Sequence, residues 1–174
     1  MQGSQAAQWV SRRLARNQRV LVASAAYLAQ HGVPSRLGDL LAHSCLVVRE
    51  NGNAQGQRFD TWTSHPANGT RPEQVRVHGP LSSNSGELVR DWCLQGRGIM
   101  LRSLWDVAPE LTAGKLERVL PGYAMLQADI HWLAPCCPDL PRRIRLLIDF
   151  LVAEFEDPPW KASQLSALPA GRPD

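Results

Sequence analysis

The stretch from Gly79 to Trp105 constrains the fold of this chain most strongly, because strand-like and helix-like patterns follow one another in it with clear boundaries. The polar run SSNS at positions 82–85 precedes a segment whose apolar residues recur at helical spacing. Asn84 and Glu87, three residues apart, have the arrangement of a capping box, in which each side chain bonds the other's backbone N–H. The pattern predicts a helix that begins near Asn84.

The same stretch continues with a glycine turn, a short apolar run and a second helix start. Gly96 and Gly98 allow the chain to turn tightly into Ile99–Leu101, which predicts a buried strand, and Arg102 and Ser103 then open another helical pattern. In an open α/β sheet, ligands bind at the carboxyl ends of strands, where helix starts offer unpaired N–H groups and partial positive charge. We therefore expect a site for a small polar or anionic ligand, although serine and asparagine before a helix most often act only as caps.

Arg102 is the charged residue with the strongest claim on that site, because it follows an apolar strand directly. Its planar guanidinium could pair with a ligand carboxylate. A salt bridge to Asp106 or Glu110 would explain it equally well, and the sequence leaves both interpretations open.

Apolar periodicity, glycine and proline predict the remaining elements. The range 50–73 is rich in turn residues and predicts a loop that carries an aromatic hairpin. The last predicted helix, 141–155, is strongly amphipathic, so one of its faces must be buried. The other expected strands are 20–23, 45–48, 75–77, 116–120 and 128–134, and the other expected helices are 25–31, 37–42 and 104–113.

Composition excludes several classes of protein. With 174 residues and 44% hydrophobic content, the chain holds one domain or one domain with part of another. The net charge of +3 comes from scattered residues and is too small to indicate nucleic-acid binding. No apolar run is long enough for a membrane helix, and the first residues do not form a signal peptide. The four cysteines lack CxxC spacing, so we expect reduced thiols and a cytoplasmic location.

Known catalytic and cofactor motifs are also missing from the sequence. The five histidines lie on separate predicted elements without metal-site spacing, so no metal ion is expected. Neither the phosphate-binding loop motif nor the dinucleotide fingerprint occurs, and no cofactor is expected. No GxSxG motif is present either. These observations favour a binding protein over an enzyme.

Several phrases of the sequence, in one collinear order, resemble a known family. They are RVLVASAAYLAQHGVPSRLGDLLAHSCLVVRE, VRVHGPLSSNSGELVRDWCLQGRGIMLRSLWDVAPELTAGKLERVLPGY, IHWLAP and RRIRLLIDFLVAEF. Together, over about Leu14 to Phe155, they resemble the effector-binding region of LysR-type transcriptional regulators. The resemblance implies an α/β fold like that of type 2 periplasmic binding proteins. In it, two subdomains are joined by two crossover segments, and a small inducer binds in the cleft between them.

By this resemblance the chain contains an essentially complete second regulatory subdomain and only remnants of the first. We expect a flexible start or cloning remnant at 1–8, a crossover segment at 9–18, regulatory subdomain II at 19–122, a crossover strand and C-terminal helix of subdomain I at 123–156, and a disordered tail at 157–174.

The resemblance also implies which residues face the cleft. They lie at the end of the first strand, at the start of the helix after 82–85, and after the strand at 99–101. The expected ligand-binding residues are Ala23, Ser24, Ser83, Asn84, Ser85, Arg102 and Ser103.

The chain departs from the family pattern at its beginning. It starts after the winged helix-turn-helix, so we expect a fragment that does not by itself bind operator DNA specifically. It also lacks the sheet that would cover the apolar face of 141–155. Exposure of that face would forgo on the order of 10 kcal/mol, so we expect another copy of the chain, as in a homodimer, or a local rearrangement to cover it. The alternative function is a free-standing solute-binding protein or a dominant-negative dimerisation module.

Overall fold

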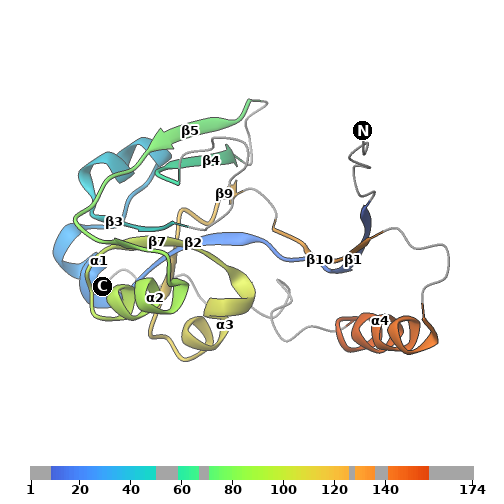
Figure 1. Ribbon diagram of the computed structural model, residues 1–174. Helices are drawn as coiled ribbons and strands as arrows, with labels where there is room; N and C mark the ends of the chain where they lie inside the picture. Colours follow the sequence, from blue (N-terminus) through green and yellow to red (C-terminus); the bar gives the residue numbers. More distant parts are fainter. Residues whose placement is uncertain (1–8, 50–58, 67–70, 126–127, 136–140, 157–174) are drawn as a thin grey trace, which may run out of the picture.

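The computed structural model describes residues 9–49, 59–66, 71–125, 128–135 and 141–156 (Figure 1). The ends expected to be flexible, 1–8 and 157–174, lie outside these residues, as does part of the expected loop at 50–73. The strands are β1 (Trp9–Ala15), β2 (Arg19–Ala23), β3 (Cys45–Val48), β4 (Thr61–Pro66), β5 (Glu73–Arg76), β6 (Ser82–Ser83), β7 (Ile99–Ser103), β8 (Glu117–Val119), β9 (Tyr123–Met125) and β10 (Ile130–Pro135). The helices are α1 (Ala25–His31), the 3-10 helix η1 (Leu37–Ala42), α2 (Gly86–Leu94), α3 (Leu104–Thr112) and α4 (Arg142–Glu154).

A five-stranded central sheet with the order β6-β3-β7-β2-β8 forms the middle of the molecule. Strand β3 runs parallel to both of its neighbours, β6 and β7. Strand β2 runs antiparallel to β7, with Arg19 opposite Ser103 and Val22 opposite Met100. The carboxyl ends of β3, β6 and β7 therefore lie at one edge of the sheet, and β2 ends at the opposite edge.

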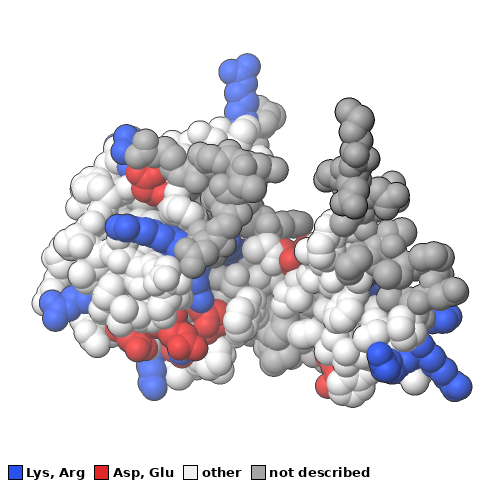
Figure 2. All heavy atoms as spheres, in the orientation of Figure 1, with Lys and Arg blue, Asp and Glu red and all other residues white. Residues whose placement is uncertain are grey.

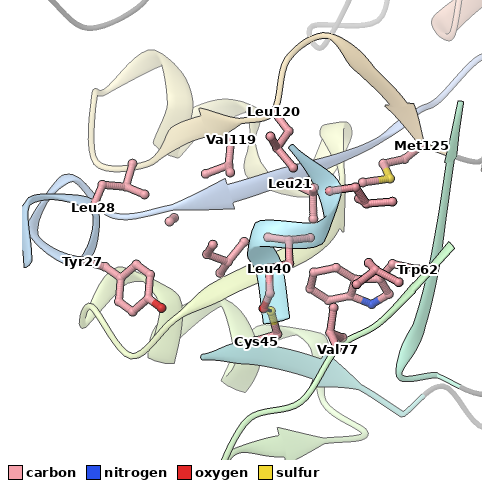
Figure 3. Packing of buried hydrophobic residues seen from close by; sticks show 14 residues of the cluster. Leu21, Tyr27, Leu28, Leu40, Cys45, Trp62, Val77, Val119, Leu120 and Met125 are labelled. Carbon is pink, nitrogen blue, oxygen red and sulfur yellow. Dashed lines mark hydrogen bonds between the residues drawn. The ribbon is translucent and has the colours of Figure 1, made fainter. Parts of the chain in front are cut away.

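Separate apolar clusters cover the two faces of the central sheet, because side chains alternate along each strand. Leu21 and Ala23 of β2 join the cluster beneath α1, η1 and the outer sheet β5-β4-β9. Val20 and Val22, from the same strand, join the cluster beneath α2 and α3. Figure 3 shows the first cluster, into which the outer sheet inserts Trp62. The helices α2 and α3 consequently lie side by side on one face (Figure 1).

Most predicted elements are confirmed, and one helix has a different capping residue from the one predicted. Helix α1 has the predicted bounds, and the predicted aromatic hairpin forms where β4 pairs with β5. Helix α2 begins near Asn84, as predicted, but without the predicted capping box of Asn84 and Glu87. Its N-cap is Ser85, whose Oγ accepts the Leu88 N–H at 3.3 Å, and Ser83 Oγ accepts the Ser85 N–H at 3.1 Å. Two serine hydroxyls thus fill the place expected for the asparagine.

A second structural unit, the β1–β10 ribbon with α4 packed on it, extends from the central sheet (Figure 1). Ile148 of α4 is buried, and Asp149 accepts a hydrogen bond from Arg12 of β1 at 3.2 Å. Leu146 and Phe150 remain 59% exposed, so the ribbon covers only part of the apolar face of α4. The expectation that another copy covers the rest stays a prediction. Neither α4 nor any other described helix has the length and apolar character needed to cross a membrane.

Two glycines allow neighbouring segments to approach the start of β3. A Cβ on Gly98 would overlap the Ser44 carbonyl oxygen, and a Cβ on Gly79 would overlap that of Cys45. The close approach lets Ser44 accept the Ile99 N–H at 2.9 Å, and it lets the Cys45 N–H bond to the His78 carbonyl at 3.0 Å. The parallel neighbours of β3 therefore depend on the lack of a side chain at both positions.

Gly98→Ala should lower the free energy of unfolding by about 1–3 kcal/mol, the usual cost of overpacking a rigid region. Gly38→Ala is the matched control, because a Cβ on Gly38 meets nothing within 4 Å. Urea denaturation of both variants checks the prediction. Equal midpoints for the two variants would contradict it.

A buried tyrosine connects α1 to the segment that precedes β3. Tyr27 Oη accepts the Ser44 N–H at 2.9 Å, and it lies 3.2 Å from His43 Nδ1. The Tyr27 hydroxyl can donate to Nδ1 or accept from it, depending on the tautomer of the ring. Burial of His43, followed by the charge of His31, lowers the pKa of His43 below its ordinary value.

The stability of the protein should therefore decrease as the pH falls below about 6.5, the ordinary pKa of histidine. The unfolded chain takes up a proton there, whereas folded His43 resists it, so the stabilisation is complete only above that pH. Chemical denaturation from pH 8 to about pH 5 measures the slope. His43→Gln should flatten the profile, while His65→Gln, at an exposed position, should not. Identical slopes for the two variants would show that His43 is not responsible.

Candidate functional site

The edge where β3, β6 and β7 end collects most of the polar residues that the sequence singles out. Val48 of β3 pairs with Ser83 of β6, and the Arg49 N–H bonds to the Ser83 carbonyl at 2.7 Å. Arg49 Nη2 also donates to Ser82 Oγ at 2.6 Å. The sequence gives no signal for Arg49 beyond its place directly after an apolar strand. We refer to this edge as the candidate site.

The start of α2 forms one wall of the candidate site. The hydroxyl oxygens of Ser83 and Ser85 accept backbone N–H groups, as described above, and their hydroxyl hydrogens can be donated outward. Asn84, between them, is exposed. Helix α2 directs its N-terminal end, with its partial positive charge, at the same place. The structure thus brings together all three residues of this group that the sequence predicts.

The start of α3 forms the neighbouring wall, and two of its N–H groups are already bonded. Ser103 occupies the N-cap position without a side-chain capping bond. The Leu104 N–H donates to the Gln18 carbonyl at 2.8 Å, and the Trp105 N–H donates to Asn17 Oδ1 at 3.4 Å. The start of α3 is therefore anchored to the connection between β1 and β2.

Arg102 forms a salt bridge with Asp106, which is one of the two roles that the sequence left open for it. Its Nε donates to Asp106 Oδ2 at 2.7 Å, and its Nη2 contacts the same oxygen. Arg90 of α2 donates to the other carboxylate oxygen, Oδ1, at 3.0 Å and lies 3.9 Å from Glu110 Oε1. Two cations and two anions form this cluster, whose side chains are 8–28% exposed. The cluster joins the starts of α2 and α3 beneath the candidate site.

The lack of a side chain at Gly86 leaves room for the guanidinium of Arg102. A Cβ on Gly86, the first residue of α2, would lie 2.7 Å from Arg102 Cζ. The side chain of Arg102 therefore lies across the first turn of the helix, where any other residue at position 86 would displace it. The sequence contains no signal for this contact beyond a glycine at the beginning of a helix.

The structure does not bring Ala23 and Ser24 to the candidate site. Because β2 is antiparallel to β7, its carboxyl end lies beside the beginning of β7, at the opposite edge of the central sheet. Ser24 caps α1 by accepting the Tyr27 N–H at 3.3 Å, and it lies against Gly96. Ala23 and Ser24, which the family resemblance implied as ligand-binding residues, therefore lie apart from the other expected ligand-binding residues.

The cysteines that the structure describes are buried in the apolar clusters, away from the candidate site. Burial raises the pKa of the Cys45 and Cys93 thiols to about 12, which keeps both free thiols protonated. In the part of the chain that the structure describes, no group of three His, Cys, Asp or Glu side chains could hold a metal ion. Figure 2 shows acidic side chains over α2 and α3 and basic ones over α4, so the face in view carries charge of both signs.

Gly86→Ala tests the contact with Arg102. Alanine normally stabilises a helix relative to glycine by about 0.5–1 kcal/mol. Here the substitution should instead destabilise the protein, because the guanidinium must leave Asp106, and loss of a hydrogen bond between charged groups costs about 1.5–3 kcal/mol. In an Arg102→Ala background the same change should be neutral or stabilising. A double-mutant cycle from urea denaturation measures the difference, and an equal cost in both backgrounds would contradict the contact.

The architecture is that of a type 2 periplasmic-binding-protein-like α/β domain, as in the regulatory domains of solved transcriptional regulators. The chain belongs to the LysR substrate binding domain family, which matches residues 2–156. Both the predicted family and the predicted fold are therefore confirmed.

Curated relatives of the chain are transcriptional regulators. It is 46% identical over 148 residues to the HTH-type transcriptional regulator DmlR of Escherichia coli K12, a match that covers 85% of this chain and 46% of DmlR. It is 31% identical to the regulator CrgA of Neisseria meningitidis MC58, covering 78% of this chain and 43% of CrgA. The chain thus spans about half the length of these relatives.

Solved structures show the same likeness. CrgA from Neisseria meningitidis matches with a TM-score of 0.71 and 27% identity, over 89% of this chain and 51% of CrgA. The full-length virulence activator AphB of Vibrio cholerae matches with a TM-score of 0.71 and 25% identity, over 88% of this chain and 50% of AphB.

Proposed function

We propose that this chain is the small-molecule effector-sensing part of a LysR-type transcriptional regulator, and that its effector binds at the candidate site. Membership of the substrate binding domain family supports the sensing role. The location rests on one observation, the parallel alignment of β6, β3 and β7, which delivers two helix starts to the same edge. Of the ligand-binding residues expected from the sequence, the proposal retains Ser83, Asn84, Ser85 and Ser103 and keeps Arg102 in the wall beneath them.

The effector proposed for this site is a small polar or anionic molecule. Hydroxyl groups, an exposed amide and the positive end of α2 surround the position, and each of them favours an acceptor or a negative charge. The guanidinium of Arg49 lies at the same edge, bonded to Ser82. Arg102 adds less net charge than the sequence suggests, because Asp106 neutralises it.

Sensing requires that the effector favour one arrangement of the protein over another. In this structure the candidate site faces the part of the molecule from which the β1–β10 ribbon extends (Figure 1). We propose that an effector in the site biases the position of the ribbon and α4 relative to the central sheet. In the complete regulator this bias would reach the DNA-binding part.

Ser85→Ala should weaken effector binding about tenfold, the usual effect of one lost hydrogen bond to a charged group. Ser24→Ala is the matched control, because Ser24 caps α1 through the same kind of 3.3 Å bond at the opposite edge. Both variants should lose about 1 kcal/mol of stability with the cap. Thermal-shift titrations with acetate, succinate, malonate and inorganic phosphate identify a binding anion and compare its affinity for the two variants.

Equal loss of affinity in both variants would place the site elsewhere. Failure of every anion in the panel to shift the melting temperature would reject the proposed anionic class. A neutral polar compound that binds and that depends on Ser85 would leave the location intact and change the class.

A further inference from the structure

The central sheet and the β1–β10 ribbon are joined by two chain connections. One connection, 16–18, leads from β1 into β2, and the other, of which the structure describes 128–129, leads into β10. The two connections lie together, because the Ala128 N–H donates to the Asn17 carbonyl at 3.0 Å. Any change in the orientation of the ribbon must be accommodated here.

Asn17 is the residue that bonds both connections to each other. Its side chain is buried, with 4% of the residue exposed. Its Nδ2 donates to the Ala128 carbonyl at 3.0 Å, and its backbone N–H donates to Asp129 Oδ1 at 3.1 Å. Arg13 of β1 holds the second oxygen of that carboxylate at 3.3 Å. The side-chain amide of Asn17 thus joins the two connections at the point where the backbone pairing of β1 with β10 begins.

The same side chain reaches the candidate site. Its Oδ1 accepts the Trp105 N–H of α3 at 3.4 Å, and the adjacent Gln18 carbonyl accepts the Leu104 N–H at 2.8 Å. Asn17 therefore uses its acceptor atom on the start of α3 and its donor atom on the second connection. A side chain that only accepts, such as aspartate, or that is apolar cannot do both.

We propose that Asn17 is a positioning residue that sets the orientation of the ribbon and links it to the start of α3 at the candidate site. The purpose of this role rests on the proposed function. An effector bound beside Ser103 would shift the backbone at Trp105, and the side-chain amide of Asn17 would transmit that shift to Ala128. The structural part of the proposal holds without any effector. Removal of the amide should leave both folded units intact and free their relative orientation.

Asn17→Ala tests the proposal by removing both side-chain bonds without adding charge. Spin labels on Gln95→Cys, at the end of α2, and on Leu146→Cys, on α4, report the distance between the central sheet and the ribbon. Both positions are exposed, whereas the native Cys45 and Cys93 are buried and protonated. Cys136 and Cys137 are replaced by serine in every variant. Pulsed electron spin resonance then gives the distribution of distances in the full chain.

The distribution should become about twofold broader in Asn17→Ala, as expected when two packed units gain freedom at their connection. It should stay unchanged in Gln30→Ala, the control, which removes an exposed side-chain amide on α1, at the opposite edge of the central sheet from the candidate site. Asn17→Asp, which keeps the size and the acceptor but loses the donor, should broaden the distribution as well. Circular dichroism confirms that each variant is folded. A purely structural role would lower the melting temperature without widening the distribution.

An unchanged distribution in both Asn17 variants would overturn the proposal, whatever the effector does. Addition of an anion that binds in the thermal-shift titrations should narrow the distribution of the parent chain and leave that of Asn17→Ala broad. If no anion binds but the variants still broaden, the positioning role stands and the proposed anionic class of effector fails. Narrowing by the anion to the same width in the parent and in Asn17→Ala would overturn the link to α3.

Discussion

The parallel pairing of β3 with both β6 and β7 is the constraint on which the rest of the structure depends. Parallel strands end at the same edge, so the chain must place the starts of α2 and α3 next to each other. The pairing is possible because Gly79 and Gly98 let their backbones contact Cys45 and Ser44 directly. Two positions without side chains thus determine where the polar residues of the candidate site meet.

The charged groups beneath the candidate site have a mainly structural role and do not themselves serve to attract a ligand. Arg102 and Arg90 share the carboxylate of Asp106, and this arrangement fixes α2 against α3 in a largely buried environment. A buried charge of this kind is tolerated only when it is paired and hydrogen-bonded. In the proposed function, the helix starts and the hydroxyl groups attract the ligand, and the ion cluster maintains their positions.

Local sequence signals predicted the elements well, and they named some of the residues that meet at the candidate site. Helix α1 has the predicted bounds because Ser24, Gly32 and the apolar spacing all agree. The capping residue of α2 was predicted wrongly because three serines and an asparagine compete for the cap, and only tertiary context selects Ser85. Strand direction left no local signal, so the separation of Ser24 from the site could not be predicted. The role of Asn17 was equally hidden, since its partners lie 88 or more residues away.

The most direct test of the location is a map of backbone amide shifts in the ¹⁵N-labelled chain during titration with a binding anion. If effectors bind where β6 and β7 end, the amides of 83–88 and 103–105 should shift together and saturate with one affinity. The amides of Ser24 and Gly96, at the opposite edge, should stay in place. Shifts that centre on Ser24 and Gly96, with none at the start of α2, would contradict the account.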